Sequence, residues 1–201
     1  MKIRLEEEKD YYEVETLTRE AFWNVYRPGC FEHFVLHQLR KDPCFVNELD
    51  YVLEEEGKII AHIAYAKGKL TLEDGNIQDI LLFGPVSVLP AYQKQGYGEQ
   101  LIRYTMQKAQ ELGYNEIVIT GNPEYYHKYG FESASKYHIY YEGMSVEEEA
   151  AFFMIHIFNK NMKVHSGIYS DPECYFVDEK EVDIFDQLFP AKMKEIREGQ
   201  L

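Results

Sequence analysis

Two glycines one residue apart, placed at the start of an amphipathic helix, constrain this chain more than any other feature. A strand-like run ends at Val88, a polar turn follows, and Gly96 and Gly98 open a helix that extends to about residue 113. Glycine has no Cβ, so at both positions the backbone can approach a bound molecule closely. The first amides of a helix have no intrahelical acceptor, and the helix dipole is positive there. The segment therefore predicts a cradle for a phosphate or pyrophosphate group.

Other glycine-rich phosphate motifs do not fit this segment. No Gly-Lys-Ser/Thr follows the glycines, as a P-loop requires, and Leu101 stands where a dinucleotide-binding motif has its third glycine. A turn glycine followed by a close-packing glycine is the purely structural alternative. Lys94, just before the glycines, adds a mobile positive charge and favours the phosphate interpretation.

Strand-like and helical segments alternate along the rest of the chain. Turn signals at Gly57 and at Asp74-Gly75 join neighbouring strands. This order predicts an α/β (α+β) fold in which helices cover the faces of a mixed sheet. We expect helices over residues 10–24, 31–40, 96–113 and 123–129, and strands over residues 1–5, 51–55, 59–67, 77–88, 116–120, from 131 onward and within 148–158.

Three local features refine this prediction. Asp10 is placed to cap the first helix. Gly84-Pro85 interrupts the strand over residues 77–88, and because proline cannot donate to a sheet we expect a bulge or a splayed edge there. The helix over residues 96–113 has a single apolar stripe, formed by Leu101, Ile102, Met106, Ala109 and Leu112.

Composition limits the partners of the protein. The formal charge is −14 at pH 7, from 21 basic and 35 acidic residues. Such a field repels phosphate backbones and attracts cations, so it disfavours nucleic-acid binding and favours an amine substrate. The N-terminus lacks the apolar core of a signal peptide, and the longest apolar run, residues 80–92, is broken by prolines and too short to span a membrane. We expect a cytoplasmic protein without a membrane partner.

Cysteine usage gives no sign of a cross-link or a metal site. Cys30, Cys44 and Cys174 are odd in number and widely spaced, and the sequence has no Cys-x-x-Cys. This pattern suggests neither a disulfide framework nor a zinc site. His33 and His37 share a helix face, but with no third ligand in view we expect no metal.

Residues 93–98 read Gln-Lys-Gln-Gly-Tyr-Gly and resemble the acetyl-CoA signature of the GNAT acyltransferase superfamily, Gln/Arg-x-x-Gly-x-Gly/Ala. In that family a Val-x-Val-x-Pro strand end precedes the signature, as residues 86–90 do here. A second family element follows, a strand, a short helix and Tyr-x-x-x-Gly-Phe, which residues 126–131 match. The wording of residues 121–131 is similar to one branch of predicted small-molecule N-acetyltransferases, the YhbS type. The resemblance is close over residues 77–131 and looser over residues 1–158.

The resemblance implies a GNAT fold, a mixed and mostly antiparallel sheet with a splayed central strand flanked by helices, and acetyl-CoA as co-substrate. It implies that Tyr126 is the general acid that protonates the departing thiolate, with a packing role and the neighbouring Tyr125 as alternatives. The main chain near residues 86–88 would pair with the pantetheine arm and supply an oxyanion donor. The implied cofactor-binding residues are Val86, Ser87, Val88, Gln93, Lys94, Gln95, Gly96, Tyr97, Gly98 and Asn122.

The implied role of Asn122 has a structural alternative, and the general base is not assigned. Asn122 could contact the pantetheine arm or simply form the turn before proline. Many members of the family place a glutamate on the fourth strand as general base, whereas residues 82–84 supply no carboxylate here. Asp79, His62 and water-mediated deprotonation remain open for that role.

Acceptor recognition is expected from the first two helices, where aromatic and acidic residues cluster, although the same residues could form a solvated helix start. These residues are Trp23, Tyr26, Glu32, His33 and His37, and Tyr169, Tyr175 and Phe176 could wall the same pocket. We expect residues 1–158 to form the GNAT domain and residues 159–201 a C-terminal extension packed on it.

The resemblance therefore predicts an N-acetyltransferase that acts on a primary amine of a small molecule or protein, and dimers are common among such proteins. One alternative is a catalytically silent acyl-CoA sensor or interaction module on the same fold. Another is a protein that binds a mononucleotide in the glycine cradle.

Overall fold

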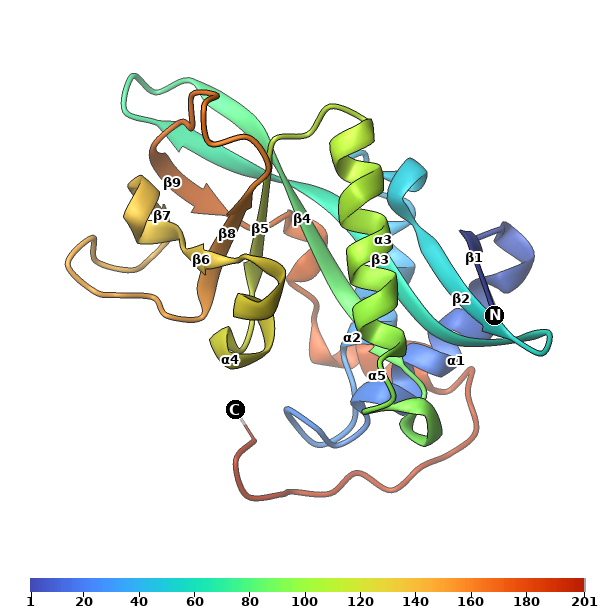
Figure 1. Ribbon diagram of the computed structural model, residues 1–201. Helices are drawn as coiled ribbons and strands as arrows, with labels where there is room; N and C mark the ends of the chain where they lie inside the picture. The colour runs from blue at the N-terminus through green and yellow to red at the C-terminus, as the bar shows by residue number, and fades with distance from the viewer. Residues whose placement is uncertain (201) are drawn as a thin grey trace. The chain divides into compact units, whose positions relative to one another are not determined.

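The computed structural model describes residues 1–200, which form two compact units. Unit 1 comprises Met1–Ala64, Pro85–Thr105 and the chain from Glu173 onward, and unit 2 comprises Tyr65–Gly84 and Met106–Pro172. Three elements run from one unit into the other, namely β3 (Lys58–Leu72), β4 (Ile77–Val88) and α3 (Tyr97–Glu111) (Figure 1). None of the helices in residues 1–200 is both long enough and apolar enough to cross a membrane.

Unit 1 contains an antiparallel strand set and two N-terminal helices. β1 (Lys2–Leu5) pairs with β2 (Tyr51–Glu55), which pairs with the first half of β3. Helices α1 (Tyr11–Phe22) and α2 (Glu32–Leu39) bury residues at helical spacing, which are Val14, Leu17 and Thr18 on α1 and His33, Leu36 and Leu39 on α2. Each helix thus buries one mainly apolar stripe, which stabilises it in the folded chain.

The C-terminal segment of unit 1 folds onto these helices. α5 (Glu179–Asp186) begins at Asp178, whose carboxylate accepts the amide hydrogens of Lys180 and Glu181. At its other end, Asp186 receives two hydrogen bonds from the buried Arg19 on α1, at 2.6 and 3.0 Å. The Trp23 indole donates to the Met193 carbonyl at 3.0 Å.

Unit 2 contains strands of both orientations. β4 pairs in parallel with β5 (Glu116–Thr120), β5 and β6 (Glu132–Ser133) pair antiparallel with β8 (Phe153–Ile157), and the end of β3 pairs antiparallel with β9 (Gly167–Ser170). β9 also pairs in parallel with β7 (Ile139–Tyr141). The short helix α4 (Pro123–Tyr126) and a 3-10 turn (His127–Tyr129) follow β5.

The predicted fold class is confirmed, and three strands have the predicted limits, over residues 51–55, 77–88 and 116–120. The β4–β5 register ends at Leu82–Val118, two residues before Gly84-Pro85, as a splayed strand requires. The domain boundary after residue 158 stays a prediction.

Several local predictions are wrong, for identifiable reasons. α3 ends at Glu111 before Gly113 takes a φ of 92°, so Leu112 is 53% exposed and is not part of the stripe. Asp10 occupies the N-cap of α1, but its carboxylate binds Arg4 and the Glu7 amide instead of the helix. β7, β9 and α5 were not predicted, and β3 extends beyond its predicted end at residue 67, to Leu72.

Candidate functional site

The predicted phosphate cradle lies in unit 1, where β4 gives way to α3. Lys94 and Gly96 both have left-handed backbone, with φ of 59° and 89°. The first hydrogen bond of α3 runs from the Gln100 amide to the Gly96 carbonyl at 3.0 Å, so the amides of Tyr97 and Gly98 precede the helical ladder. A Cβ added at Gly96 would meet no atom within 4 Å. The turn thus combines helix-start amides, an exposed lysine and open space, the requirements of an anion site.

Two glutamines brace this turn from within. The Gln93 side chain donates to the Val88 carbonyl at 3.0 Å, and the Gln95 side chain donates to the Ala91 carbonyl at 2.8 Å. Both side-chain amides are therefore used to hold the turn. The Gln93 backbone amide also donates within the turn, to the Pro90 carbonyl at 3.3 Å, whereas the resemblance assigns the pyrophosphate to the backbone amides of residues 95–98.

The end of β4 alternates between buried and half-buried side chains. Ser87 is fully buried, and its hydroxyl donates to Thr18 on α1 at 2.9 Å. Val86 and Val88 on either side are half-buried. The side chain of Ser87 anchors the strand to α1, so only main-chain groups of Val86–Val88 could take part in pairing with an extended ligand.

Tyr126 lies in unit 2, at the last residue of α4, and is half-buried. Its ring centroid is 4.9 Å from that of Tyr125 and 6.0 Å from those of both Phe83 and Phe131. It also lies directly over Gly121, because a Cβ on that glycine would stand 2.5 Å from the Tyr126 Cε2 atom. Neighbouring rings and a glycine without a side chain thus fix the orientation of this tyrosine, and the sequence analysis gave Gly121 no role.

Asn122 is the N-cap of α4. Its Oδ1 atom accepts the Glu124 amide hydrogen at 2.9 Å, and Pro123 occupies the first helical position. This bond is the turn-forming role that the sequence analysis weighed against a ligand contact. It uses Oδ1 and leaves the Nδ2 group outside the cap.

Neither residue considered as a general base is placed for that work. His62 is fully buried and lies 2.7 Å from Asp50 through its Nε2 atom, and burial lowers the pKa of His62 to about 4. Asp79, in unit 2, accepts a hydrogen bond from Lys69 at 2.6 Å and has Lys67 at 3.8 Å. One residue is sealed from solvent, and the other is paired with two cations.

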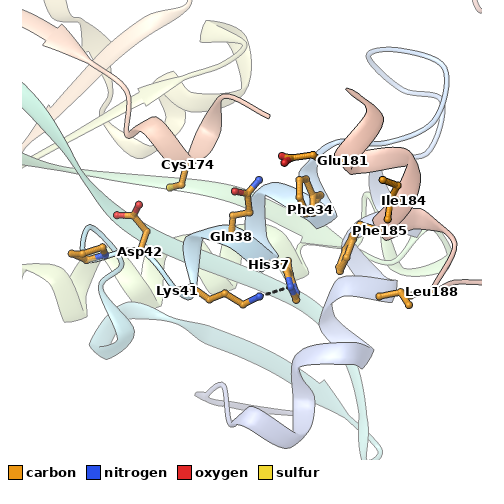
Figure 2. A pocket seen from close by; sticks show the side chains of 11 residues that line it. Phe34, His37, Gln38, Lys41, Asp42, Cys174, Glu181, Ile184, Phe185 and Leu188 are labelled. Atoms are coloured by element: carbon orange, nitrogen blue, oxygen red, sulfur yellow. Dashed lines mark hydrogen bonds between the residues drawn. The ribbon is translucent and has the colours of Figure 1, made fainter. Parts of the chain in front are cut away.

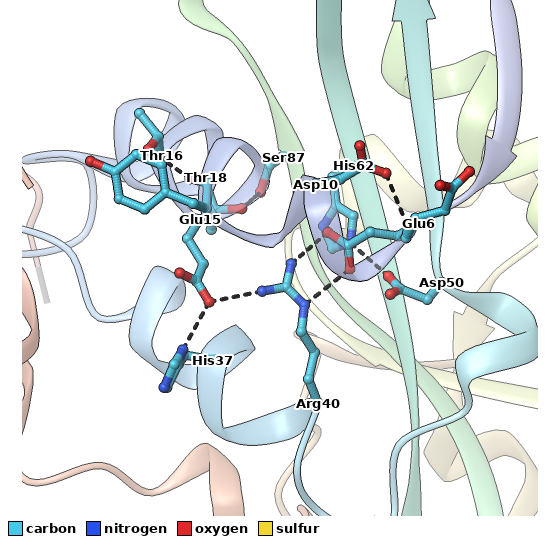
Figure 3. A network of polar contacts seen from close by, with 12 residues as sticks. Glu6, Asp10, Glu15, Thr16, Thr18, His37, Arg40, Asp50, His62 and Ser87 are labelled. Atoms are coloured by element: carbon cyan, nitrogen blue, oxygen red, sulfur yellow. Dashed lines mark hydrogen bonds and ion pairs between the residues drawn. The ribbon is translucent and has the colours of Figure 1, made fainter. Parts of the chain in front are cut away.

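A buried polar network of unit 1 surrounds His62 and was not foreseen (Figure 3). The Arg40 side chain is 3% exposed and donates to both carboxylate oxygens of Glu6, at 3.0 and 2.6 Å, and to Glu15 at 2.9 Å. Glu15 also contacts the His37 Nδ1 atom at 2.9 Å. The residues come from β1, α1, α2 and β3 and the segments beside them, so no local sequence pattern indicates the network.

The residues expected to recognise an acceptor have mostly structural contacts. Glu32 accepts the Phe31 amide hydrogen at 3.0 Å, and His33 is buried beside Asp186 and Phe185. His37 alone among these lines a cavity of about 710 Å³, together with residues of α2, α5 and the turn at Cys174 (Figure 2). Tyr169 is buried in unit 2, whereas Phe176 is exposed.

A family model and a curated relative that match this chain are both acetyltransferases. Residues 47–133 match the family model described as "Acetyltransferase (GNAT) domain". The chain is 29% identical over 135 residues to the "Uncharacterized N-acetyltransferase YhbS" of Escherichia coli (strain K12), covering 67% of this chain and 75% of that one.

Solved structures agree with these sequence relatives. A GNAT family acetyltransferase from Brucella melitensis, solved in complex with acetyl-CoA, is 26% identical, with a TM-score of 0.69 over 87% of this chain and 97% of that one. YhbS from Escherichia coli, solved in complex with CoA, has a TM-score of 0.73 at 24% identity, over 87% and 91% of the two chains. The chain therefore shares its fold with these GNAT structures.

Proposed function

We propose that the chain is an N-acetyltransferase that moves the acetyl group of acetyl-CoA to a primary amine of a small molecule or protein, because residues 47–133 match the model of a GNAT acetyltransferase domain. The observation that carries the proposal is the turn before α3, with Lys94 and Gly96 in left-handed backbone and an open space at the Gly96 Cα. That turn lies within the matched residues and suits the pyrophosphate of a CoA thioester.

In the proposed reaction a neutral amine attacks the thioester carbonyl, and the C–S bond then breaks to release CoA. The main-chain N–H groups of residues 86–88 would stabilise the oxyanion, because preorganised donors act at the point where charge develops. The Tyr126 hydroxyl would protonate the departing thiolate. Since both side chains considered as a base are otherwise engaged, we propose that water carries the proton away from the ammonium group.

The cofactor is proposed to bind through ten residues. The amides of residues 95–98, with Gln93 and Lys94, would hold the pyrophosphate, and the main chain of residues 86–88 would pair with the pantetheine arm. Asn122 would reach that arm through its Nδ2 group, since its Oδ1 caps α4. Two related proteins whose structures were solved in complex with acetyl-CoA and with CoA support this ligand class.

A catalytically silent acyl-CoA sensor is the second candidate. Its support is the engagement of His62 and Asp79, which leaves the protein without an assigned base. The sensor and the enzyme would both bind acetyl-CoA, but only the enzyme would release free thiol in the presence of an amine.

The test is a thermal melt with and without acetyl-CoA, followed on the same sample by thiol release against a panel of amines. Binding to the native state must raise the melting temperature. Stabilisation with amine-dependent thiol release supports the enzyme, and stabilisation without release across the panel supports the sensor. An unchanged melting temperature at saturating acetyl-CoA contradicts both.

Gly96→Val tests the cradle, with Gly57→Val as its matched control. Both glycines have positive φ, 89° and 81°, and both face open space, so the backbone strain is comparable. We expect Gly96→Val to lose acetyl-CoA stabilisation and Gly57→Val to keep it, because only the first would block approach to the helix start. Equal stabilisation of the two variants by acetyl-CoA would remove the cradle assignment.

A further inference from the structure

Two cysteines that lie far apart in the sequence meet in unit 1. Cys44 lies in the turn after α2, and Cys174 lies 130 residues later, in the 3-10 turn Glu173–Tyr175. Their Sγ atoms are 3.8 Å apart, and both residues are free thiols. A disulfide requires about 2.0 Å between the sulfurs, so the observed separation is that of two thiols in hydrogen-bond contact.

A carboxylate completes the group. Ligand atoms of Asp42, Cys44 and Cys174 all lie within 4.8 Å of one another. The Cys44 amide donates to Asp42 Oδ1 at 2.8 Å, which fixes the orientation of the carboxylate beside the two thiols. In metal sites, hydrogen bonds from groups that do not bind the metal orient the residues that do.

We propose that Asp42, Cys44 and Cys174 form a binding site for Zn²⁺. Two sulfur ligands at about 2.3 Å from a tetrahedral zinc ion lie about 3.8 Å apart, which is the separation seen here. Two sulfurs and one oxygen suit a borderline cation, whereas Mg²⁺ and Ca²⁺ require mostly oxygen ligands. Binding converts both thiols to thiolates and releases their two protons to solvent.

The proposed site borders a cavity that a ligand can occupy. Asp42 and Cys174 also line the cavity of about 710 Å³, and Figure 2 shows them at one end of it. A site with three protein ligands keeps an open position for water or for a donor atom of a bound molecule. The ion would also tie the C-terminal segment to the turn after α2, two parts of unit 1 that are distant in sequence.

The experiment uses the full chain without a histidine tag, reduced and freed of metal by a chelator. Co²⁺ is titrated first, because thiolate coordination produces a sulfur-to-cobalt charge-transfer band in the near ultraviolet. Zn²⁺ is then added to displace it. We expect the band at one equivalent of Co²⁺, its loss with Zn²⁺, and an affinity at least about a hundredfold lower in Cys44→Ser and in Cys174→Ser. Cys30→Ser is the matched control and should bind as the parent does, since its thiol contacts Glu32.

A second measurement needs no variant. Zn²⁺ should protect Cys44 and Cys174 of the parent chain from alkylation, as counted by peptide mass spectrometry, and should not change the labelling of Cys30. The proposal is overturned if Co²⁺ produces no charge-transfer band, if Zn²⁺ protects neither thiol, or if the only response of the pair is a disulfide under oxidant. Cobalt bound at the other candidate group, Glu6, Asp50 and His62, would lack the sulfur band and would also count against it.

Discussion

The two units are stabilised by different kinds of interaction. Unit 1 buries charged side chains, and the largest of these are Arg19 and Arg40, each held by carboxylates and stacked over an aromatic ring. Unit 2 buries rings, and in two places a tyrosine lies directly over a glycine, Tyr126 over Gly121 and Tyr169 over Gly68. The stability of unit 1 should therefore respond to charge and pH, and that of unit 2 to volume.

The largest effect is expected from Arg40→Leu. The substitution breaks the buried ion pair of Arg40 with Glu15 and removes its two hydrogen bonds to Glu6, and breaking a buried ion pair from one side costs about 3–5 kcal/mol. The measurement is the free energy of unfolding from denaturant titration. Arg103→Leu is the control, since that arginine pairs with Glu99 on the surface of α3, where exposed pairs contribute less than about 1 kcal/mol. If both variants lose the same free energy of unfolding, the buried pairs of Arg40 contribute no more to stability than the exposed pair of Arg103.

Acidification should destabilise the protein next most strongly, through the buried histidines of unit 1. Burial lowers the pKa of both His33 and His62 to about 4, below the usual value near 6.5. Because the folded pKa is depressed, the folded state binds fewer protons, so stability is fully present above about pH 6.5 and falls toward pH 4. Each shift corresponds to about 3 kcal/mol, and the opposite shift of Glu6 offsets part of their sum, so the net loss ranks below that of Arg40→Leu.

Other charged groups modify this profile. Burial raises the pKa of Glu6 to about 8, which works in the opposite direction by favouring the folded state as pH falls from about 8 toward 4.5. His33 faces Asp186, Arg19 and His37 and lies between Phe185 and Phe189. We expect His33→Phe to reduce the loss of stability between pH 6.5 and 4, while the exposed His127→Asn leaves the slope unchanged. If stability falls with pH as steeply in His33→Phe as in the parent, His33 does not contribute to the loss of stability in acid.

In unit 2 we expect stability to depend on the volume of buried side chains, and Gly121→Ala tests this by adding one methyl group. The added Cβ would lie 2.5 Å from the Tyr126 ring, so the ring or the backbone must shift, at a cost of about 1–3 kcal/mol. We expect turnover to fall as Tyr126 moves, with the affinity for acetyl-CoA nearly kept. Gly68→Ala is the matched control, because its Cβ would lie equally close to Tyr169. Gly68→Ala should lose a similar amount of stability and keep its turnover. If turnover falls equally in both variants, the loss in Gly121→Ala does not come from a displaced Tyr126.

The contrast also explains what the sequence could predict. Strands β2, β4 and β5 and the turn before α3 depend on local patterns of apolar residues, glycine and proline, and these were read correctly. The bonds between Arg40 and Glu6, and the meeting of Cys44 and Cys174, join residues far apart in the chain, so no spacing rule reveals them. α5 had a usable signal that was missed, since Asp178 followed by Glu181 resembles a capping box.

The smallest effect, and the one that bears most directly on chemistry, is expected from Tyr126→Phe. The ring contacts with Phe83, Tyr125 and Phe131 need no hydroxyl, so folding and acetyl-CoA affinity should stay close to those of the parent. Loss of a general acid should lower kcat about tenfold or more, which equals about 1.4 kcal/mol at the barrier. Tyr125→Phe is the control, because its ring meets that of Tyr126 edge to face and is more exposed. If kcat falls in Tyr125→Phe and not in Tyr126→Phe, the acid is the neighbouring tyrosine, and if it falls in neither, the thiolate leaves without a tyrosine proton.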